Sequence, residues 1–418
     1  MTGPTDPPRL RYRRWLVTLG VTLIVGTGAG VGFFLIAFRP PLSAKKVDQL
    51  IARWDSMVEP VDSGGRVDVS PRLESLAKDL RRTIAAWEAT NGLRFERLDF
   101  DVLPPADDPL WDELEATFRP TLQALDSLPM NGRVPPEPLE AVPTGVEDLG
   151  PFLNLARVWS ISCERHGRQH ELVPLANRFL PLVAVRDREV IYAHLSTSGL
   201  ILELTSFVAP GIPVAQPEDL ARLRERLRRS SASMSELDRC FARHARFDVR
   251  QIREFMKPDA TEYREATNAL ERSHRYLKYQ ASTVAHRWSR LLELPRDRGW
   301  SHLAQAAEAY VRSVEADRGD WRLRLANAFW VNFAAVVEMQ AKLRVEISAV
   351  RVAVIAEQHR RQFGAYPETL EAIRGELEIE PDLLPFYDPI RLARSDGKLI
   401  VRIDSAVHPT ILELSTSP

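Results

Sequence analysis

The residues best suited to metal chemistry lie in one short stretch, Cys163-x-x-His166-x-x-x-His170. Thiolate and imidazole are good zinc ligands, but a structural zinc site takes four ligands and this stretch has three. Gly167 is expected to turn the chain between two helices, which would separate Cys163 from His170. We therefore predict neither a bound metal nor a cofactor, and Cys163, His166 and His170 remain the metal candidates.

No local motif names a reaction. The sequence has no Gly-x-Ser-x-Gly elbow, no His-Glu-x-x-His and no phosphate loop. Carboxylates are so plentiful along the expected helices that no pair stands out for acid-base work, and the catalytic residues are unknown. An active site assembled from distant residues leaves no such signature. A pocket gathering two or more carboxylates or histidines would favour an enzyme, and filled clefts would favour a binding or structural protein.

Composition narrows the possible partners. The 418 residues carry a formal net charge of -1, with 44% hydrophobic and 27% charged residues. A folded protein is expected, and nucleic-acid binding is not, because it needs a strong basic excess. Cys163 and Cys240 are the only cysteines. A disulfide scaffold is excluded, whereas a single bridge, which could contribute about 4 kcal/mol, stays open.

One segment predicts a membrane anchor. Trp15 to Phe38 carries no charged residue and follows a short tail, 1–14, that is rich in arginine. As a helix this segment would be about 36 Å long, enough to cross a bilayer. The flanking arginines favour an N-terminus inside the bacterial inner membrane and an extracytoplasmic remainder. Two overlapping Gly-x-x-x-Gly spacings are typical of dimerising membrane helices and would pair the anchors of two chains: Gly26, Gly28, Gly30 and Gly32.

The remainder reads as mainly helical. Apolar periodicity predicts a first helical region over 39–128 and a second over 151–318, which form a bundle or a layered array. The stretch 129–150 is rich in proline and reads as a linker. A basic stripe follows Leu220, and its Arg222, Arg226 and Arg229 are expected on the wet face. There they could bind lipid head groups or an anionic polymer.

A spine helix and a small sheet are expected over 319–418. Trp321 to Phe363 is apolar nearly all round, which predicts a buried helix, and Gly364 offers the left-handed conformation that ends one. A short helix is expected from Pro367 to Arg374. Two stretches of period two flank Asp396-Gly397 and predict a hairpin that pairs Leu392 with Val401 and Ile390 with Ile403. Thr410 to Leu414 is a possible third strand.

The segment from Lys342 to His408 resembles the C-terminal half of the major pseudopilin of bacterial type II secretion systems. The likeness lies in an apolar helix, a Gly-x-Tyr-Pro step, a leucine, an Asp-Pro and a small sheet: Ala353 to Phe363, Gly364-Ala365-Tyr366-Pro367, Leu370, Asp388-Pro389 and the hairpin around Asp396-Gly397. Membrane-anchored bacterial proteins of unassigned activity look similar. The resemblance implies that Tyr366 and Pro367 take part in interactions with envelope or secretion proteins.

Together these patterns predict a single-pass bacterial envelope protein that acts by protein interaction or assembly. The alternative is a membrane-tethered hydrolase or polymer-modifying enzyme with a cleft between helices. The patterns identify no substrate, partner or oligomeric state.

Overall fold

The computed structural model describes most of the chain: residues 36–58, 67–95, 105, 107–128, 132–133, 149–184, 191–230, 234–257, 273–296, 299–328, 333–378, 390–395, 398–405 and 408–415. The predicted anchor lies outside these residues except for 36–38, as do its four glycines and most of the predicted linker. Within the described part, no helix combines the length and the apolar character needed to span a membrane.

The chain divides into two compact units, and both are discontinuous in sequence. The smaller unit takes residues 1–52, 248–289 and 315–331, and the larger takes 53–247, 290–314 and 332–418. The predicted regions 39–128 and 151–318 therefore each contribute to both units. Segments far apart in the chain pack together, and no linear reading of composition detects that.

The smaller unit is held by aromatic packing and by polar links between distant segments. Phe38 meets the rings of Tyr276 and Tyr279 edge-on, with centroids 5.5 and 5.6 Å away. The Leu42 N–H donates to Ser282 Oγ at 2.8 Å, and Ser282 Oγ donates back to the Leu42 carbonyl at 3.0 Å. These contacts tie the segment before α2 to α11. The unit draws, in whole or in part, on the following elements: α2 (Ala44–Val58), α9 (Met234–Glu254), α11 (His274–Leu292), η4 (Trp321–Leu323) and α13 (Arg324–Ala328).

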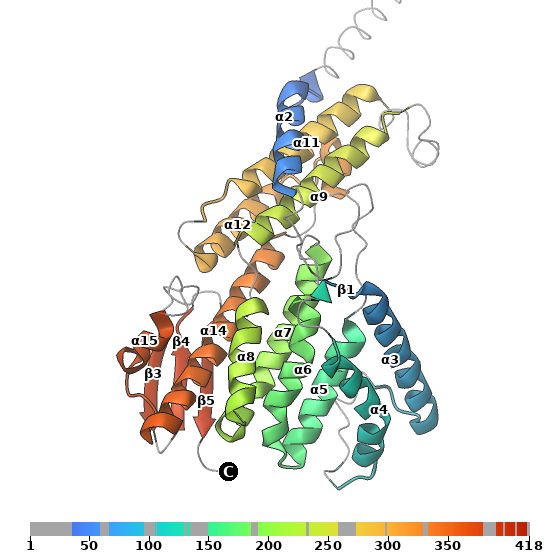
Figure 1. Cartoon of the computed structure of the whole chain (residues 1–418). Helices are drawn as coiled ribbons and strands as arrows, with labels where there is room; N and C mark the ends of the chain where they lie inside the picture. The colour runs from blue at the N-terminus through green and yellow to red at the C-terminus, as the bar shows by residue number, and fades with distance from the viewer. Residues whose placement is uncertain are drawn as a thin grey trace, which may run out of the picture. The chain divides into compact units, whose positions relative to one another are not determined.

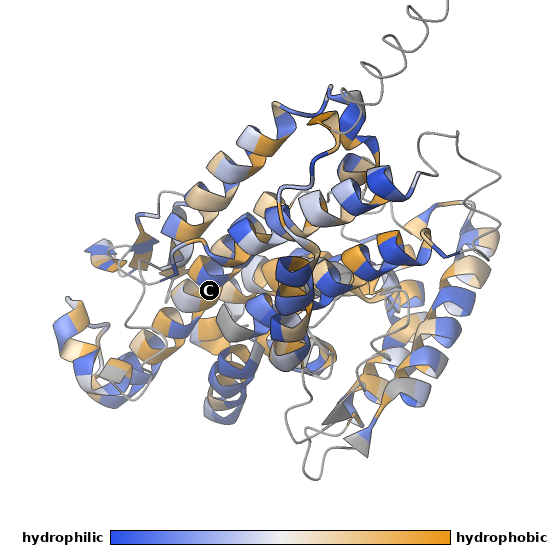
Figure 2. Ribbon diagram, turned by 90° about the horizontal axis from the view of Figure 1, so that it is seen from above, coloured by the Kyte–Doolittle hydropathy of each residue, from blue (hydrophilic) through white to orange (hydrophobic). Residues whose placement is uncertain are grey.

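The larger unit is an array of packed helices with a small sheet at one side (Figure 1). A single buried apolar cluster runs through α3 to α8, α14 and the sheet. The helices carry apolar and polar residues along opposite sides (Figure 2), as amphipathic helices around a shared core do. Their bounds are α3 (Ser70–Asn91), α4 (Leu110–Asp126), α5 (Gly150–Arg165), α6 (Leu172–Ala184), α7 (Ile191–Val208), α8 (Pro217–Ser230), α9 (Met234–Glu254) and α12 (Trp300–Glu315). A short parallel bridge joins β1 (Val67–Asp68) and β2 (Gly132–Arg133).

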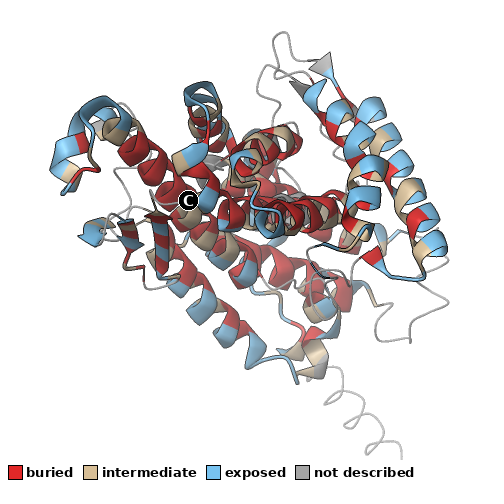
Figure 3. Ribbon diagram, turned by 90° about the horizontal axis from the view of Figure 1, so that it is seen from below, coloured by how far each residue is buried: buried red, intermediate tan, exposed pale blue. Residues whose placement is uncertain are grey.

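The predicted buried spine is α14 (Phe333–Phe363), which packs on α7 and α8. Every residue from Ile347 to Glu357 is buried, so the expectation drawn from its apolar circumference is confirmed. Figure 3 shows buried residues around the full turn of the innermost helices and exposed residues on the outward side of the marginal ones. The predicted start at Trp321 is wrong, because 321–328 form the separate elements η4 and α13 and belong to the smaller unit.

The sheet follows α14 and has the strand order β3-β4-β5, all antiparallel: β3 (Ile390–Ser395), β4 (Lys398–Ile403) and β5 (Thr410–Ser415). The register pairs Leu392 with Val401 and Ile390 with Ile403, as predicted, and the third strand is present. β4 and β5 lie against α14 (Figure 1). Burial of one strand face fixes the register, because a slip of one residue would turn that face to solvent.

Two glycines shape the turns around this core. Gly364 ends α14 at φ 81°, and its N–H donates to the Arg360 carbonyl at 2.7 Å, as the left-handed cap requires. The short helix expected at Pro367 instead begins at Leu370, as η5 (Leu370–Ile373) and α15 (Arg374–Glu378). In η3 (Ala209–Val214), Gly211 lies so close to η2 (Gln169–Glu171) that an added Cβ would come within 2.8 Å of the Gln169 carbonyl oxygen.

Candidate anion-binding site

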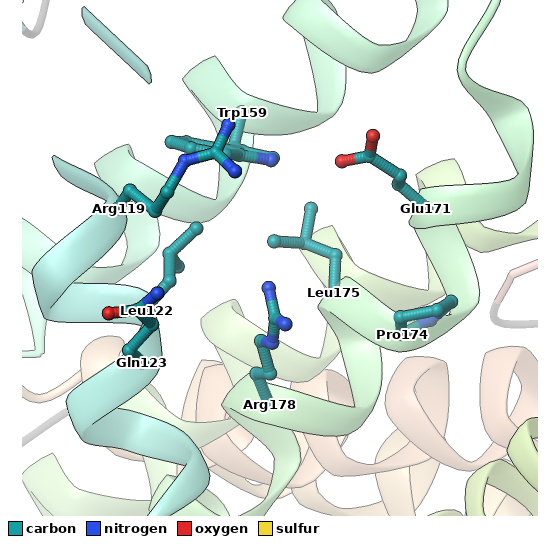
Figure 4. Close-up of a pocket in the computed structure, with 8 residues that line it drawn as sticks. All are labelled: Arg119, Leu122, Gln123, Trp159, Glu171, Pro174, Leu175 and Arg178. Atoms are coloured by element: carbon teal, nitrogen blue, oxygen red, sulfur yellow. The ribbon is translucent and has the colours of Figure 1, made fainter. Parts of the chain in front are cut away.

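A pocket of about 240 Å³ opens in the larger unit between α4, α5 and the start of α6. Apolar side chains form part of its floor, most of its accessible lining is polar, and two guanidinium groups, one carboxylate and one amide stand around it (Figure 4). The lining residues are Arg119, Leu122, Gln123, Trp159, Glu171, Pro174, Leu175 and Arg178. The formal charge of this lining is positive.

Helical spacing brings these side chains to one place. Arg119, Leu122 and Gln123 follow the i, i+3, i+4 spacing on α4. The residues from Glu171 to Arg178 follow i, i+3, i+4 and i+7 across the end of η2 and the first turns of α6. Each set therefore presents one helix face, and packing of α4 and α5 against α6 turns the faces toward each other.

Trp159 supplies a hydrogen-bond donor at the floor. Its side chain comes from α5 and the residue is only 3% exposed. Figure 4 shows the ring nitrogen turned toward the side of the pocket where Glu171 lies. Among the described residues, none accepts a hydrogen bond from this indole N–H. This N–H is therefore left to donate to an acceptor within the pocket.

The two arginines direct positive charge into the same space. Figure 4 shows the guanidinium of Arg119 entering from α4 and that of Arg178 from α6. Asp126 accepts from Arg178 Nε at 3.1 Å, which orients the fork, and the described residues offer no acceptor to its two terminal nitrogens. Arg119 is held more loosely, 3.5 Å from a carboxylate oxygen of Glu115. A planar fork held at Nε is well suited to grip a carboxylate.

A polar network behind the pocket holds the turn from which Glu171 projects. Glu115 accepts a hydrogen bond from Ser162 Oγ at 2.9 Å and two from Arg168. Arg168 reaches Glu171 only at 3.4 Å, and the Cys163 thiol lies 3.9 Å from the other oxygen of Glu171. Glu171 thus keeps acceptor capacity on the pocket side, because Arg168 donates mainly to Glu115.

The three metal candidates do not converge on a metal site. Cys163 is fully buried, and burial, with Glu171 next in effect, raises the pKa of its thiol to about 12. His166 and His170 are exposed, and His166 Nδ1 lies 2.8 Å from the Ser162 carbonyl oxygen. In the described part of the chain, no group of three or more His, Cys, Asp or Glu residues could hold a metal ion. Cys163 and Cys240 are both free thiols.

The predicted basic stripe on α8 has only part of the expected exposure. Arg222 and Arg229 are exposed, and each has an acidic partner one turn away, Asp219 at 3.3 Å and Glu225 at 2.6 Å. Arg226 is half-buried, and desolvation lowers the pKa of its guanidinium. The prediction from helical periodicity was wrong for Arg226, because packing of α6 on α8 covers part of the face that would be exposed to solvent in an isolated helix.

Tyr366 and Pro367 are buried, and Tyr366 belongs to a network inside the larger unit. The Tyr366 hydroxyl donates to Glu357 at 3.0 Å, and burial raises the pKa of that hydroxyl. Glu357 is fully buried and also accepts from Arg360 at 2.7 Å and Arg361 at 2.6 Å. Arg361 donates in addition to the Ala215 carbonyl at 2.7 Å. The Gly-x-Tyr-Pro step thus fastens the end of α14 to its surroundings.

Sequence reasoning missed every residue of the pocket. Arg119, Arg178 and Glu171 each resemble ordinary charged residues on a helix surface, and Trp159 resembles an ordinary core residue. The available signal was the i, i+3, i+4, i+7 run from Glu171 to Arg178, which mixes charge and apolar groups on a single face. The pocket gathers one carboxylate and no histidine, which falls short of the pattern expected of the enzyme alternative.

Comparison of the chain with protein-family models, with curated proteins and with solved structures gave no match.

Proposed function

We propose that this protein recognises a small carboxylate ligand in the pocket between α4, α5 and α6. The observation that carries the proposal is the convergence of Arg119 and Arg178 on a cavity toward which the Trp159 N–H, without an acceptor among the described residues, also points. A ligand carboxylate would accept from all three groups. Charge-assisted hydrogen bonds of this kind are each worth about 1.5–3 kcal/mol.

The size and charge of the pocket limit the ligand. Its volume of about 240 Å³ is below the roughly 300–1,000 Å³ of pockets for drug-sized molecules, so a smaller ligand is expected. Glu171 stands on the rim and would repel a doubly charged phosphate more strongly than a singly charged carboxylate. The apolar part of the floor can accommodate a short hydrocarbon portion of a ligand.

Titration calorimetry of the full chain in detergent micelles tests this function. A short branched carboxylate such as 4-methylpentanoate should bind, and Arg178→Gln should weaken that binding roughly ten- to a hundredfold, the loss of one charged hydrogen bond. Arg82→Gln is the matched control, because Arg82 is an exposed arginine of α3 that also pairs with an aspartate. Absence of binding to the wild-type chain, or equal losses in the two variants, would refute the proposal.

We also propose that the ligand is met at a bacterial inner membrane, with residues 15–38 as the anchor, the N-terminus inside and the bulk outside. The uncharged length of this segment supports the anchor, and the arginines before it support the orientation. A phosphatase that is active only outside the cytoplasm, fused after Pro418, should be active. An inactive fusion would mean that the orientation is the opposite one or that residues 15–38 are not an anchor.

The tail sheet is the surface we propose for envelope or secretion partners. Ile411 on β5 is 61% exposed, because it lies on the outward face of the strand between the buried residues Thr410 and Leu412. Ile411→Glu should therefore reduce recovery of envelope proteins by the solubilised chain, whereas Leu93→Glu, at a partly exposed leucine beyond α3, should not. Equal recovery by both variants would show that the tail sheet is not a docking element. Point variants suit this test better than truncation, because β4 and β5 help to bury α14.

A further inference from the structure

We infer that the ligand of the pocket is a free α-amino acid with a small apolar side chain, an inference that rests on the proposed recognition of a carboxylate. The two arginines and the Trp159 N–H account for an acceptor on the ligand. They do not account for Glu171, the carboxylate that faces the same space (Figure 4). A ligand that is only an anion would meet repulsion there.

A charged donor on the ligand would replace that repulsion with a hydrogen bond to Glu171. Glu171 and the Trp159 ring nitrogen face each other across the upper part of the pocket, and no hydrogen bond joins them (Figure 4). A ligand group between them needs an acceptor on the Trp159 side and a charged donor on the Glu171 side. An α-amino acid carries a carboxylate and an ammonium on one carbon, which is the closest spacing that these two groups can have.

The supporting network leaves the carboxylate oxygens of Glu171 available to accept from an ammonium. Glu115 takes the principal hydrogen bonds of Arg168, and Arg168 contacts Glu171 at 3.4 Å through one nitrogen only. Within the described part of the chain, the second oxygen of Glu171 has only the Cys163 thiol as a donor, at 3.9 Å. A thiol is a weak donor, so an ammonium would be the stronger partner for that oxygen.

The floor selects the side chain of the ligand. Leu122, Pro174 and Leu175 come from two different helices and are the apolar members of the lining, together with the indole ring. A branched aliphatic side chain would bury apolar surface against them, at roughly 25 cal/mol per Å². A charged side chain would compete with the carboxylate and the ammonium of the ligand for the two arginines and Glu171. Leucine and valine are therefore the expected class.

Three matched probes separate this inference from the broader function. Leucine carries both charged groups, 4-methylpentanoate lacks the ammonium, and 3-methylbutylamine lacks the carboxylate. Calorimetry on the full chain in micelles should give leucine at least tenfold tighter binding than 4-methylpentanoate, with no detectable binding of the amine. Trp159→Phe keeps the aromatic floor without the N–H and should weaken leucine and 4-methylpentanoate alike.

Glu171→Gln is the decisive variant. Leucine affinity should fall about tenfold, while 4-methylpentanoate should bind at least as well as to the wild-type chain, which also shows that the pocket is folded. Glu308→Gln, at an exposed glutamate of α12, should change neither. Equal binding of leucine and 4-methylpentanoate by the wild type would overturn the amino-acid inference and leave carboxylate recognition standing. Binding of neither compound would overturn both.

Discussion

The buried acid Asp248 should make the stability of the smaller unit fall as pH rises. Burial raises the pKa of its carboxyl from an ordinary value of 3.8 to about 8, and the N–H of Trp288, which donates to it at 2.9 Å, opposes that shift. Between these two pH values the folded protein holds a proton that the unfolded chain has released. Stability is therefore greatest below the unfolded pKa and is lost progressively as pH rises through the folded pKa.

The size of the effect follows from proton linkage. One bound proton changes the free energy of unfolding by about 1.4 kcal/mol per pH unit. Two pH units inside the window, from pH 5 to pH 7, should thus remove about 3 kcal/mol. Asp248→Asn keeps an acceptor for Trp288 and cannot ionise, so its stability relative to the wild type should rise by that amount over the same range and level off above about pH 8.

Urea unfolding of the solubilised full chain, followed by circular dichroism at pH 5, 6, 7 and 8, measures this difference. Asp320→Asn is the control, because hydrogen bonds from Arg322 lower the pKa of this acid of the smaller unit. Its contribution is present above the unfolded pKa and is lost only in more acidic solution. Its curve should therefore run parallel to the wild type over the tested range. A parallel curve for Asp248→Asn as well would refute the reasoning.

Three further predictions concern the larger unit. Gly211→Ala should cost about 1–3 kcal/mol by overpacking η3 against η2, measured as a lower unfolding midpoint. Gly375→Ala should not lower the midpoint, because a Cβ there meets nothing within 4 Å. Equal midpoints for the two variants would contradict the close approach at Gly211. Glu357→Gln should cost roughly 1.5–3 kcal/mol, because it removes the charge of a buried acceptor that two partly exposed arginines share, whereas the exposed Glu371→Gln should cost little. Similar losses in the two variants would contradict the role of the network. Cys163 should resist iodoacetamide at pH 7.5 in the native chain and react in urea, as mass spectrometry can follow; rapid native labelling would contradict its burial.

The elements that follow from local periodicity could be predicted from the sequence. α14 was predictable because no face of it is polar enough to meet water, and its end was predictable from Gly364. The register of β3 on β4 was predictable because only one pairing puts Ile390 and Leu392 on the buried face. In each case a short stretch contains the whole physical reason for its structure.

The pocket could not be predicted in the same way, because it is a product of packing. Arg119, Trp159 and Arg178 come from three helices, and nothing in any one helix says which neighbour it will meet. The half-burial of Arg226 and the division into two discontinuous units have the same origin. Local patterns determine which face of a helix is buried, and the choice of partner depends on contacts between distant segments.

The position of α14 late in the sequence affects when the larger unit can complete its packing during synthesis. α7 packs on α14, and Gln340 of α14 donates to Ser198 of α7 at 2.6 Å. The packing of α7 is therefore incomplete until α14, which is synthesised much later, has formed. Until then a growing polypeptide presents the apolar side of α7 without its final cover. The last strand, β5, is added later still and lies against both α14 and η3. Native packing of the larger unit is thus completed only after α14 and β5 have been synthesised, which makes slow folding and a need for chaperones expected properties of this unit.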